Sequence, residues 1–260
     1  MLIIPLMSCA GRMPVYILIA GAFFPKKAGL VLLGLYALGI LLAVIAARIL
    51  SRFFKEDDLP FVMELPPYRI PTAKSIFRHT WEKGRQYLQK MSGVILAFSV
   101  ALWFLSYFPN HNKYDTVAQQ QEHSFIGYIG KSMEPVLEPL GFDWKMGVGI
   151  VAGVGAKELV VSTLGVMYTD DLEAATETPV ETDDGEGTTR LQQNLKKSVT
   201  PAAGLAYMVF ILLYFPCIAT FIAIKNEGGG WKWAIFTAIY TLVLAWVAAF
   251  ITFKVASFLM

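Results

Sequence analysis

The sequence predicts an all-α polytopic membrane protein with about six hydrophobic segments and a basic amphipathic interfacial helix. Hydrophobic residues make up 55% of the 260 positions and charged residues only 16%, against about 25% charged in soluble domains. The apolar residues form long blocks, and no charge interrupts 31–47 or 233–253. A helix rises about 1.5 Å per residue, so such a block can cross a hydrocarbon core roughly 30 Å thick. The composition excludes disordered and disulfide-stapled chains and disfavours an ordinary soluble domain.

Six apolar segments account for the predicted membrane-embedded structure. They cover residues 2–24, 28–50, 91–108, 146–168, 202–224 and 232–258. The first segment differs from the rest because it contains Pro5, Gly11 and Pro14 within ten residues, and a proline removes a helix hydrogen bond. We therefore expect this segment to be broken or re-entrant. Such a backbone survives at membrane depth only where protein buries it or where it lines a cavity.

Residues 51–90 predict a cytoplasmic or interfacial region that ends in a basic amphipathic helix. Four prolines between 60 and 71 favour extended backbone, and Thr72 is placed to cap the helix that follows. Its apolar residues recur at helical spacing, at Ala73, Ile76, Phe77, Trp81, Leu88 and Met91. The basic residues fall mostly elsewhere on the helical wheel, so the helix is expected to lie in the lipid headgroup plane. Docking to a partner protein is the alternative.

The segments and their connections divide the chain into five regions. These are a broken segment with a transmembrane helix over 1–50, the amphipathic region over 51–90, transmembrane helices over 91–168 with an external loop at 109–145, an acidic flexible loop over 169–200, and C-terminal transmembrane helices over 201–260. The acidic loop is assigned because 170–186 carries eight acids and no lysine or arginine. That composition is typical of solvated, disordered chain.

Lysine and arginine residues predict which side of the membrane each connection faces. If all six segments span, thirteen of these residues fall on one side and seven on the other. Because cytoplasmic connections carry the excess of basic residues, we expect the amphipathic helix and the C-terminus to be cytoplasmic. Arg12 and Lys157 lie inside apolar segments and belong to neither side.

Lys157 and Glu158 place two charges near the centre of the apolar segment 146–168. Each costs roughly 2.5–3.5 kcal/mol at mid-bilayer on a translocon scale, so such residues usually face a bundle interior or a water-filled path. The same segment carries small residues at four-residue spacing, including Gly149 and Gly153, which favours close helix contact. Two interpretations stay open: a polar path, or a buried ion pair with another helix that fixes packing.

Each of the two cysteines lies near a proline in an apolar segment. Cys9 precedes Pro14 by five residues, and Cys217 directly follows Pro216. If these stretches are helical, each proline frees the carbonyl four residues before it. The freed carbonyls would belong to Ala10 and Leu212. Discontinuous helices build ion sites in transporters, and thiol with carbonyl ligands suits a borderline or soft metal better than an alkali ion. The alternative is that each cysteine is only a small hydrophobe.

Four ordered motifs resemble the C-terminal half of the FeoB-type ferrous iron transporter family, from its second gate region through its C-terminal transmembrane helices. They are MSCAGRMPVY at 7–16, FVMELPPYRIPT at 61–72, GAKELVVSTLGVMY at 155–168 and LLYFPCIAT at 212–220. The resemblance covers nearly the whole chain. It implies transport of Fe(II) through the bacterial cytoplasmic (inner) membrane, with Fe(II) as the transported ion and no permanently bound cofactor.

The resemblance also implies roles for individual residues. Cys9 lies in the second gate motif and Cys217 in the later Pro-Cys motif, so both are candidates for transient Fe(II) contacts. Glu64 matches the acidic position of the interfacial stretch. Glu158 matches the acid of the family's intramembrane Lys-Glu pair, and Lys157 is its basic neighbour.

The chain also departs from the family pattern. The family usually has Ser-Ala after the cysteine, and this chain has Ala10 and Gly11, so a hydroxyl that would help to ligate iron is missing. Ser8 and Arg12 complete the pathway or gating candidates, with Arg12 expected to hold the broken loop or to repel cations. The family begins with a cytosolic GTP-binding domain and a first gate repeat, but no GxxxxGK[ST] occurs here. We expect a fragment or a separately encoded half, with GTP binding and any GTPase activity on the missing half or on another polypeptide.

Two other function classes stay open. One is a non-transporting membrane scaffold or assembly subunit that docks through the amphipathic helix; a homo-oligomer is compatible with this class and with transport. The other is a transporter for an organic solute such as a nucleoside, which would need convergent hydrogen-bonding side chains. An enzyme is disfavoured because His79, His111 and His123 have no metal or triad spacing. No basic face is large enough to bind nucleic acid.

Overall fold

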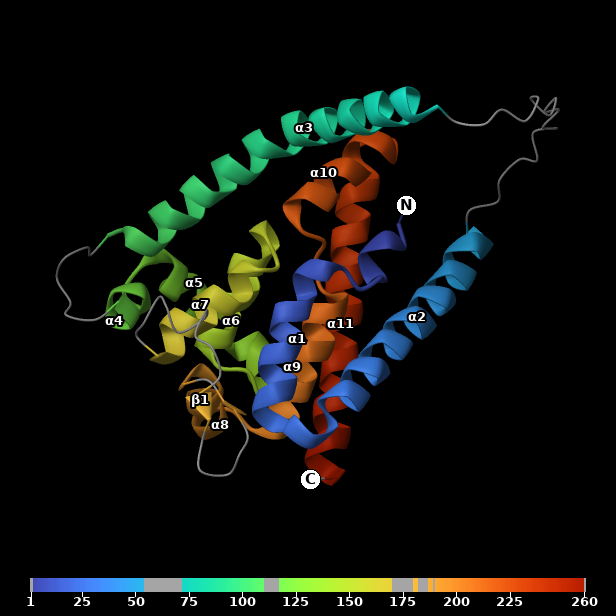
Figure 1. Cartoon of the computed structure of the whole chain (residues 1–260). Helices are drawn as coiled ribbons and strands as arrows, with labels where there is room; N and C mark the ends of the chain where they lie inside the picture. Colours follow the sequence, from blue (N-terminus) through green and yellow to red (C-terminus); the bar gives the residue numbers. More distant parts are fainter. Residues whose placement is uncertain are drawn as a thin grey trace.

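The computed structural model describes residues 2–53, 72–109, 117–169, 180–181, 187–188 and 190–259. Nearly all of them are helical (Figure 1), and the all-α polytopic membrane fold is confirmed. The α-helices are α1 (Met13–Phe23), α2 (Ala28–Phe53), α3 (Ala73–Tyr107), α4 (Val117–Glu122), α5 (Phe125–Leu137), α6 (Trp144–Gly155), α7 (Leu159–Thr169), α8 (Arg190–Ser198), α9 (Pro201–Leu213), α10 (Ile218–Glu227) and α11 (Trp231–Leu259). The short 3₁₀ helices are η1 (Ile4–Leu6), η2 (Ala10–Arg12), η3 (Pro25–Lys27) and η4 (Glu138–Leu140). Strand β1 (Val180–Glu181) pairs antiparallel with β2 (Gly187–Thr188).

Four helical stretches among the described residues are long and apolar enough to cross a membrane. They are Ile4–Phe23, Pro25–Arg52, Pro201–Glu227 and Trp231–Phe258. The first is broken, as expected, because the chain leaves η1 and turns through η2 before α1 begins. The apolar segments 91–108 and 146–168 contain shorter apolar helices, namely Leu96–Tyr107, Trp144–Gly155 and Leu159–Thr169.

Helix α9 forms the centre of the bundle, and nearly all of its side chains are buried. It packs along α11 and also contacts α1 and α2 (Figure 1). The Thr200 hydroxyl caps its first turn by accepting from the Ala203 N–H at 3.3 Å. Pro201 lies in the same turn, where its missing N–H costs no intrahelical bond. A helix that is apolar all round lies either in a protein core or in a membrane, and α9 lies in the core.

Helix α3 unites the predicted amphipathic helix and the apolar segment 91–108 in one helix of 35 residues. It begins at Ala73 as the spacing predicts, but the Thr72 hydroxyl makes no capping hydrogen bond; the Thr72 carbonyl accepts the first-turn N–H groups instead. Figure 1 shows α3 running obliquely across the top of the bundle. Phe77 and Trp81 on its predicted apolar face are 74% and 69% exposed.

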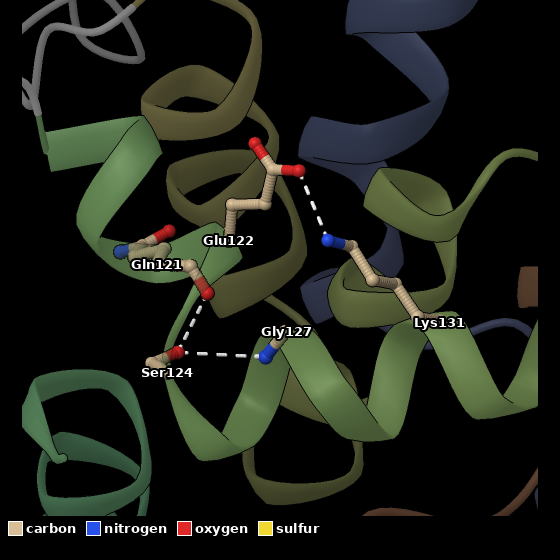
Figure 2. Close-up of polar contacts among 5 residues, drawn as sticks. All are labelled: Gln121, Glu122, Ser124, Gly127 and Lys131. Carbon is tan, nitrogen blue, oxygen red and sulfur yellow. Dashed lines mark hydrogen bonds and ion pairs between the residues drawn. The ribbon is translucent and has the colours of Figure 1, made fainter. Parts of the chain in front are cut away.

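The range 109–145, expected to be an external loop, is largely helical where it is described, since α4, α5 and η4 fold within it. Ser124 caps α5: its hydroxyl accepts from the Gly127 N–H at 3.4 Å and donates to the carbonyl three residues earlier at 2.6 Å. Lys131 donates to Glu122 at 2.9 Å (Figure 2), and this hydrogen bond holds the pKa of the Glu122 carboxyl below its ordinary value of 4.5. Because α5 packs along α6, this region is part of the bundle.

The last third of the range 169–200 forms α8, where the sequence predicts a flexible loop. Its apolar residues Leu191 and Leu195 are buried, and the helix packs against α1 and α7. Asn194 fixes it to α7 by donating to the Tyr168 carbonyl at 2.9 Å. Most of the acids that suggested the loop lie outside the described residues.

The apolar segment 146–168 is not a single helix, because it breaks at residues 156–158 between α6 and α7. Ala156 has extended backbone, with φ −146° and ψ 135°, and helical bonding resumes when the Leu159 N–H donates to the Ala156 carbonyl at 3.1 Å. The two helices then pack against each other. Two short helices in contact therefore replace the one long helix that hydropathy suggests.

Small residues on α6 allow its close contact with α7 and α9, as their spacing predicts. A Cβ added at Gly153 would lie 2.2 Å from the Tyr214 hydroxyl and 2.5 Å from Cγ2 of Val160. A Cβ added at Gly149 would lie 2.9 Å from the hydroxyl of Tyr207. All three neighbouring side chains are completely buried, so none has free space into which to move.

Gly153→Ala should therefore destabilise the fold by about 1–3 kcal/mol, the range for overpacking a filled core. Thermal unfolding of the purified chain in one detergent measures the change. Gly34→Ala on α2 is the matched control, because an added Cβ there has nothing within 4 Å. Equal melting temperatures for the two variants would contradict close packing at Gly153.

Candidate functional site

Three helix interruptions meet at one place, which we call the junction. They are residues 8–12 before α1, residues 156–158 between α6 and α7, and residues 214–217 between α9 and α10. Lys157 hydrogen-bonds to the third interruption, and the Glu158 carboxylate packs against the first. Segments far apart in the sequence, each containing predicted site residues, are therefore brought together.

Arg12 holds the first interruption in a defined conformation. It is only 2% exposed, and its guanidinium donates to the Met7 carbonyl at 2.7 Å and to the Pro5 carbonyl at 2.8 Å. Its Nε is buried without a hydrogen-bond partner. Because an arginine keeps its charge in proteins and these acceptors are neutral, the loop places a positive charge beside the junction.

The free carbonyl expected at Ala10 is not present, because this carbonyl accepts the Met13 N–H. Pro14 lies in the first turn of α1, where a proline begins a helix and breaks nothing. The Leu212 carbonyl differs from that of Ala10. Helix α9 ends at Leu213, and no N–H among the described hydrogen bonds reaches the Leu212 carbonyl.

Lys157 is buried at the second interruption, with 4% of its surface exposed. Its ammonium donates to the Phe215 carbonyl at 2.8 Å and lies 3.3 Å from the centroid of the Tyr214 ring. A carbonyl oxygen and the negative face of an aromatic ring both attract a cation. The ion pair considered for Lys157 is not formed within the described residues, where the ion pair found joins Lys131 and Glu122.

Glu158 differs from its neighbour because its side chain is exposed. A Cβ added at Gly11 would lie 2.5 Å from its Oε1, so the glycine leaves the space that this carboxylate occupies. An alanine at residue 11 would therefore require this carboxylate to move.

Cys217 lies at the third interruption, directly before α10, and is half-buried. Its Sγ is 3.2 Å from Oγ1 of Thr220, one turn further along the helix. Cys9 is exposed in the first interruption, and the residue after it is an alanine. The Cys217 thiol therefore has a hydroxyl beside it. Cys9 is followed by an alanine, which has no hydroxyl.

Electrostatic interactions link the charged and thiol-bearing residues of the junction. Arg12, Cys217, Cys9 and Glu158 all lie within electrostatic range of Lys157. The part of the chain that the structure describes contains no group of three or more histidine, cysteine or acidic side chains placed to hold a metal. The junction therefore offers thiol, hydroxyl, carbonyl and single carboxylate donors, which can contact a passing ion but do not form a closed metal cage.

Of the two remaining predicted site residues, Ser8 lies in the first interruption and Glu64 lies outside the described residues. Ser8 is half-buried, and its hydroxyl lies beside that of Tyr16 without a hydrogen bond of normal geometry. Glu64 falls in the range 54–71, which is not described.

Two junction residues are not singled out from the sequence. Tyr214 supplies the ring against Lys157, and Thr220 supplies the hydroxyl at the second thiol. Both lie within three residues of Cys217 in the LLYFPCIAT motif. The signals that indicate them are an aromatic residue at the start of the interruption and a hydroxyl one turn after Cys217.

Comparisons with known proteins agree with the resemblance. The family model described as "Ferrous iron transport protein B C terminus" matches residues 32–83. The family model "Gate", described as "Nucleoside recognition", matches residues 88–231. No solved structure matches the chain significantly.

Three curated relatives show how the chain relates to longer proteins. The Fe(2+) transport protein A/Fe(2+) transporter FeoB fusion protein of Porphyromonas gingivalis is 45% identical over 98% of this chain and 34% of its own length. The Fe(2+) transporter FeoB of Staphylococcus aureus is 36% identical over 98% of this chain and 36% of its own length. The Fe(2+) transporter FeoB of Campylobacter jejuni is 36% identical over 99% of this chain and 41% of its own length. The chain thus spans about a third to two fifths of these relatives.

Arg12→Met should release the first interruption, because two carbonyls lose a charged donor and such bonds contribute about 1.5–3 kcal/mol each. We expect faster hydrogen exchange over residues 6–12 and a lower melting temperature. Arg12→Lys should recover only part of the loss, since an ammonium lacks the two-pronged guanidinium geometry. Arg48→Met, at an exposed position on α2, is the control. Unchanged exchange over 6–12 in Arg12→Met would show that the guanidinium does not hold this loop.

Proposed function

Because the chain belongs to the Gate family and matches ferrous iron transporters over nearly its whole length, we propose that it forms part of a path for Fe(II) across the bacterial cytoplasmic membrane. The observation that carries the proposal is the junction. Both cysteines and the three helix interruptions lie near the buried Lys157, and at the third interruption no described N–H reaches the Leu212 carbonyl.

In this proposal Fe(II) exchanges water for protein donors one at a time. The ligands near the third interruption are the Cys217 thiol, the Thr220 hydroxyl and the Leu212 carbonyl. At the first interruption the ligand is the Cys9 thiol. Transport requires release as well as binding. Transient contacts with single sulfur ligands therefore suit the task better than a tetrahedral site.

The four long apolar stretches form the membrane-embedded wall around this path, and one of them contains the buried α9. We propose that the C-terminus and the basic half of α3 face the cytoplasm, in line with the excess of lysine and arginine on that side. The exposed Phe77 and Trp81 then lie in the headgroup region.

A GTP-binding domain and a first gate repeat would come from the rest of a longer protein or from a separate polypeptide, and a homo-oligomer is compatible with this arrangement. The chain spans only 34–41% of the relatives described above, which supports a role as one part of a larger transporter.

An organic solute such as a nucleoside is the second candidate, because the description "Nucleoside recognition" belongs to the family model that covers residues 88–231. A nucleoside site needs several hydrogen-bonding side chains that converge on one cavity. The side chains within electrostatic range of Lys157 are instead a guanidinium, two thiols and one carboxylate. The two thiols favour a metal cation over a nucleoside.

Replacing both thiols should slow iron transport. The double variant Cys9→Ala/Cys217→Ala, placed in the complete transporter in proteoliposomes, should take up Fe(II) at least roughly tenfold more slowly under anaerobic conditions, because metal sites lose about 10–100-fold when supporting interactions are removed. Ser132→Ala, exposed on α5, is the small-polar control and should transport normally. A double variant that folds and transports at the control rate would show that the thiols do not line the path.

A scaffold that does not transport predicts a different result in intact membranes. Membrane-impermeant maleimide applied from either side would then fail to reach Cys9 through an aqueous route. Labelling of Cys9 that Fe(II) suppresses supports the path.

A further inference from the structure

Lys157 is held by neutral groups that would equally attract a metal cation. Its ammonium lies 2.8 Å from the Phe215 carbonyl oxygen and 3.3 Å from the centre of the Tyr214 ring. No carboxylate among the described residues lies within ion-pair distance of it. A buried charge is usually paired with an opposite charge, whereas this ammonium has a carbonyl oxygen and the face of an aromatic ring.

The surroundings of Lys157 are unfavourable for a second cation. Arg12, itself 2% exposed, is one of the charges that interact with Lys157. The one acid in this group, Glu158, is exposed at the edge of the junction. Like charges in a buried site repel far more strongly than in water. A divalent ion entering the junction would therefore meet two fixed positive charges while Lys157 stays in place.

We propose that Lys157 is a tethered competing cation: its ammonium occupies the position between the Phe215 carbonyl and the Tyr214 ring, and Fe(II) enters the junction only when the ammonium withdraws. The inference rests on the proposed function, because it concerns the same path. A lysine carries its charge on a flexible four-carbon stem. The ammonium can therefore leave while the backbone of α6 and α7 keeps its place.

This arrangement also selects among cations. An entering ion must gain more from the thiol and carbonyl donors than the ammonium loses when it leaves Phe215 and Tyr214. Alkali ions gain little from thiols, whereas Fe(II) binds them well. The thiol and carbonyl ligands therefore let Fe(II), more readily than an alkali ion, compete with the Lys157 ammonium.

The first test compares two variants of the 260-residue chain in lipid nanodiscs. Fe(II) is added anaerobically, and its binding is followed as protection of Cys9 and Cys217 from a maleimide. Lys157→Met removes the charge and keeps the length, so the apparent Kd for Fe(II) should fall roughly tenfold or more because a like charge is gone. Lys157→Arg keeps the charge and should protect no better than the wild type. Equal or weaker protection in a folded Lys157→Met variant would overturn the inference.

A second measurement needs no variant, so it holds even if Lys157→Met fails to fold. Fe(II) should expose the Lys157 amine of the wild-type chain to an acylating reagent, which peptide mass spectrometry quantifies. Lys131 on α5 is the internal control, and Mg(II) should leave Lys157 unreactive. Unchanged acylation of Lys157 while Fe(II) protects both thiols would overturn the competing-cation role and leave the proposed iron path standing. If Fe(II) protects neither thiol in any folded chain, the proposed iron path is wrong, and the competing-cation role falls with it.

Discussion

The hydrogen bond from the Lys157 ammonium to the Phe215 carbonyl joins the two interruptions on which the rest of the site depends. A buried ammonium without an acceptor would be strongly unfavourable, so the break after α9 must present a carbonyl where α6 ends. Tyr214 covers the same ammonium with its ring, and Gly153 leaves room for the Tyr214 hydroxyl. Gly153 on α6 and Lys157 just after it therefore both help to hold Tyr214 and the third interruption in place.

That arrangement explains how non-helical backbone persists inside a membrane protein. Irregular backbone at membrane depth must be buried in protein or line a polar cavity. Two cationic side chains contribute to this burial. Arg12 donates to the Pro5 and Met7 carbonyls just before the first interruption, and Lys157 donates to one carbonyl of the third. The same charges give the junction a positive potential. In the proposed path, passage of Fe(II) therefore depends on moving a charge as well as on supplying ligands.

Much of the fold follows from the sequence, because bilayer thickness requires long apolar helices and the apolar blocks are plain. The sequence also singles out one residue in each interruption, because Cys9, Lys157 and Cys217 stand out within apolar segments. Their convergence is not predictable, since it depends on contacts between segments far apart in the chain. Hydropathy is insensitive to the turn at 156–158, so one long helix is expected where two occur. The expectation for the Ala10 carbonyl fails because a proline in the first turn of a helix breaks no bond.

Convergence of the interruptions around Lys157 is tested most directly by cross-linking the two native thiols. The chain has two cysteines, one in the first interruption and one in the third, so no engineered residue is required. A short bifunctional maleimide should join Cys9 to Cys217 within a single chain, seen by mass spectrometry as one linker connecting peptides from the two ends of the sequence. If both thiols react with a single-ended maleimide but the bifunctional reagent gives only cross-links between chains, the two interruptions do not meet.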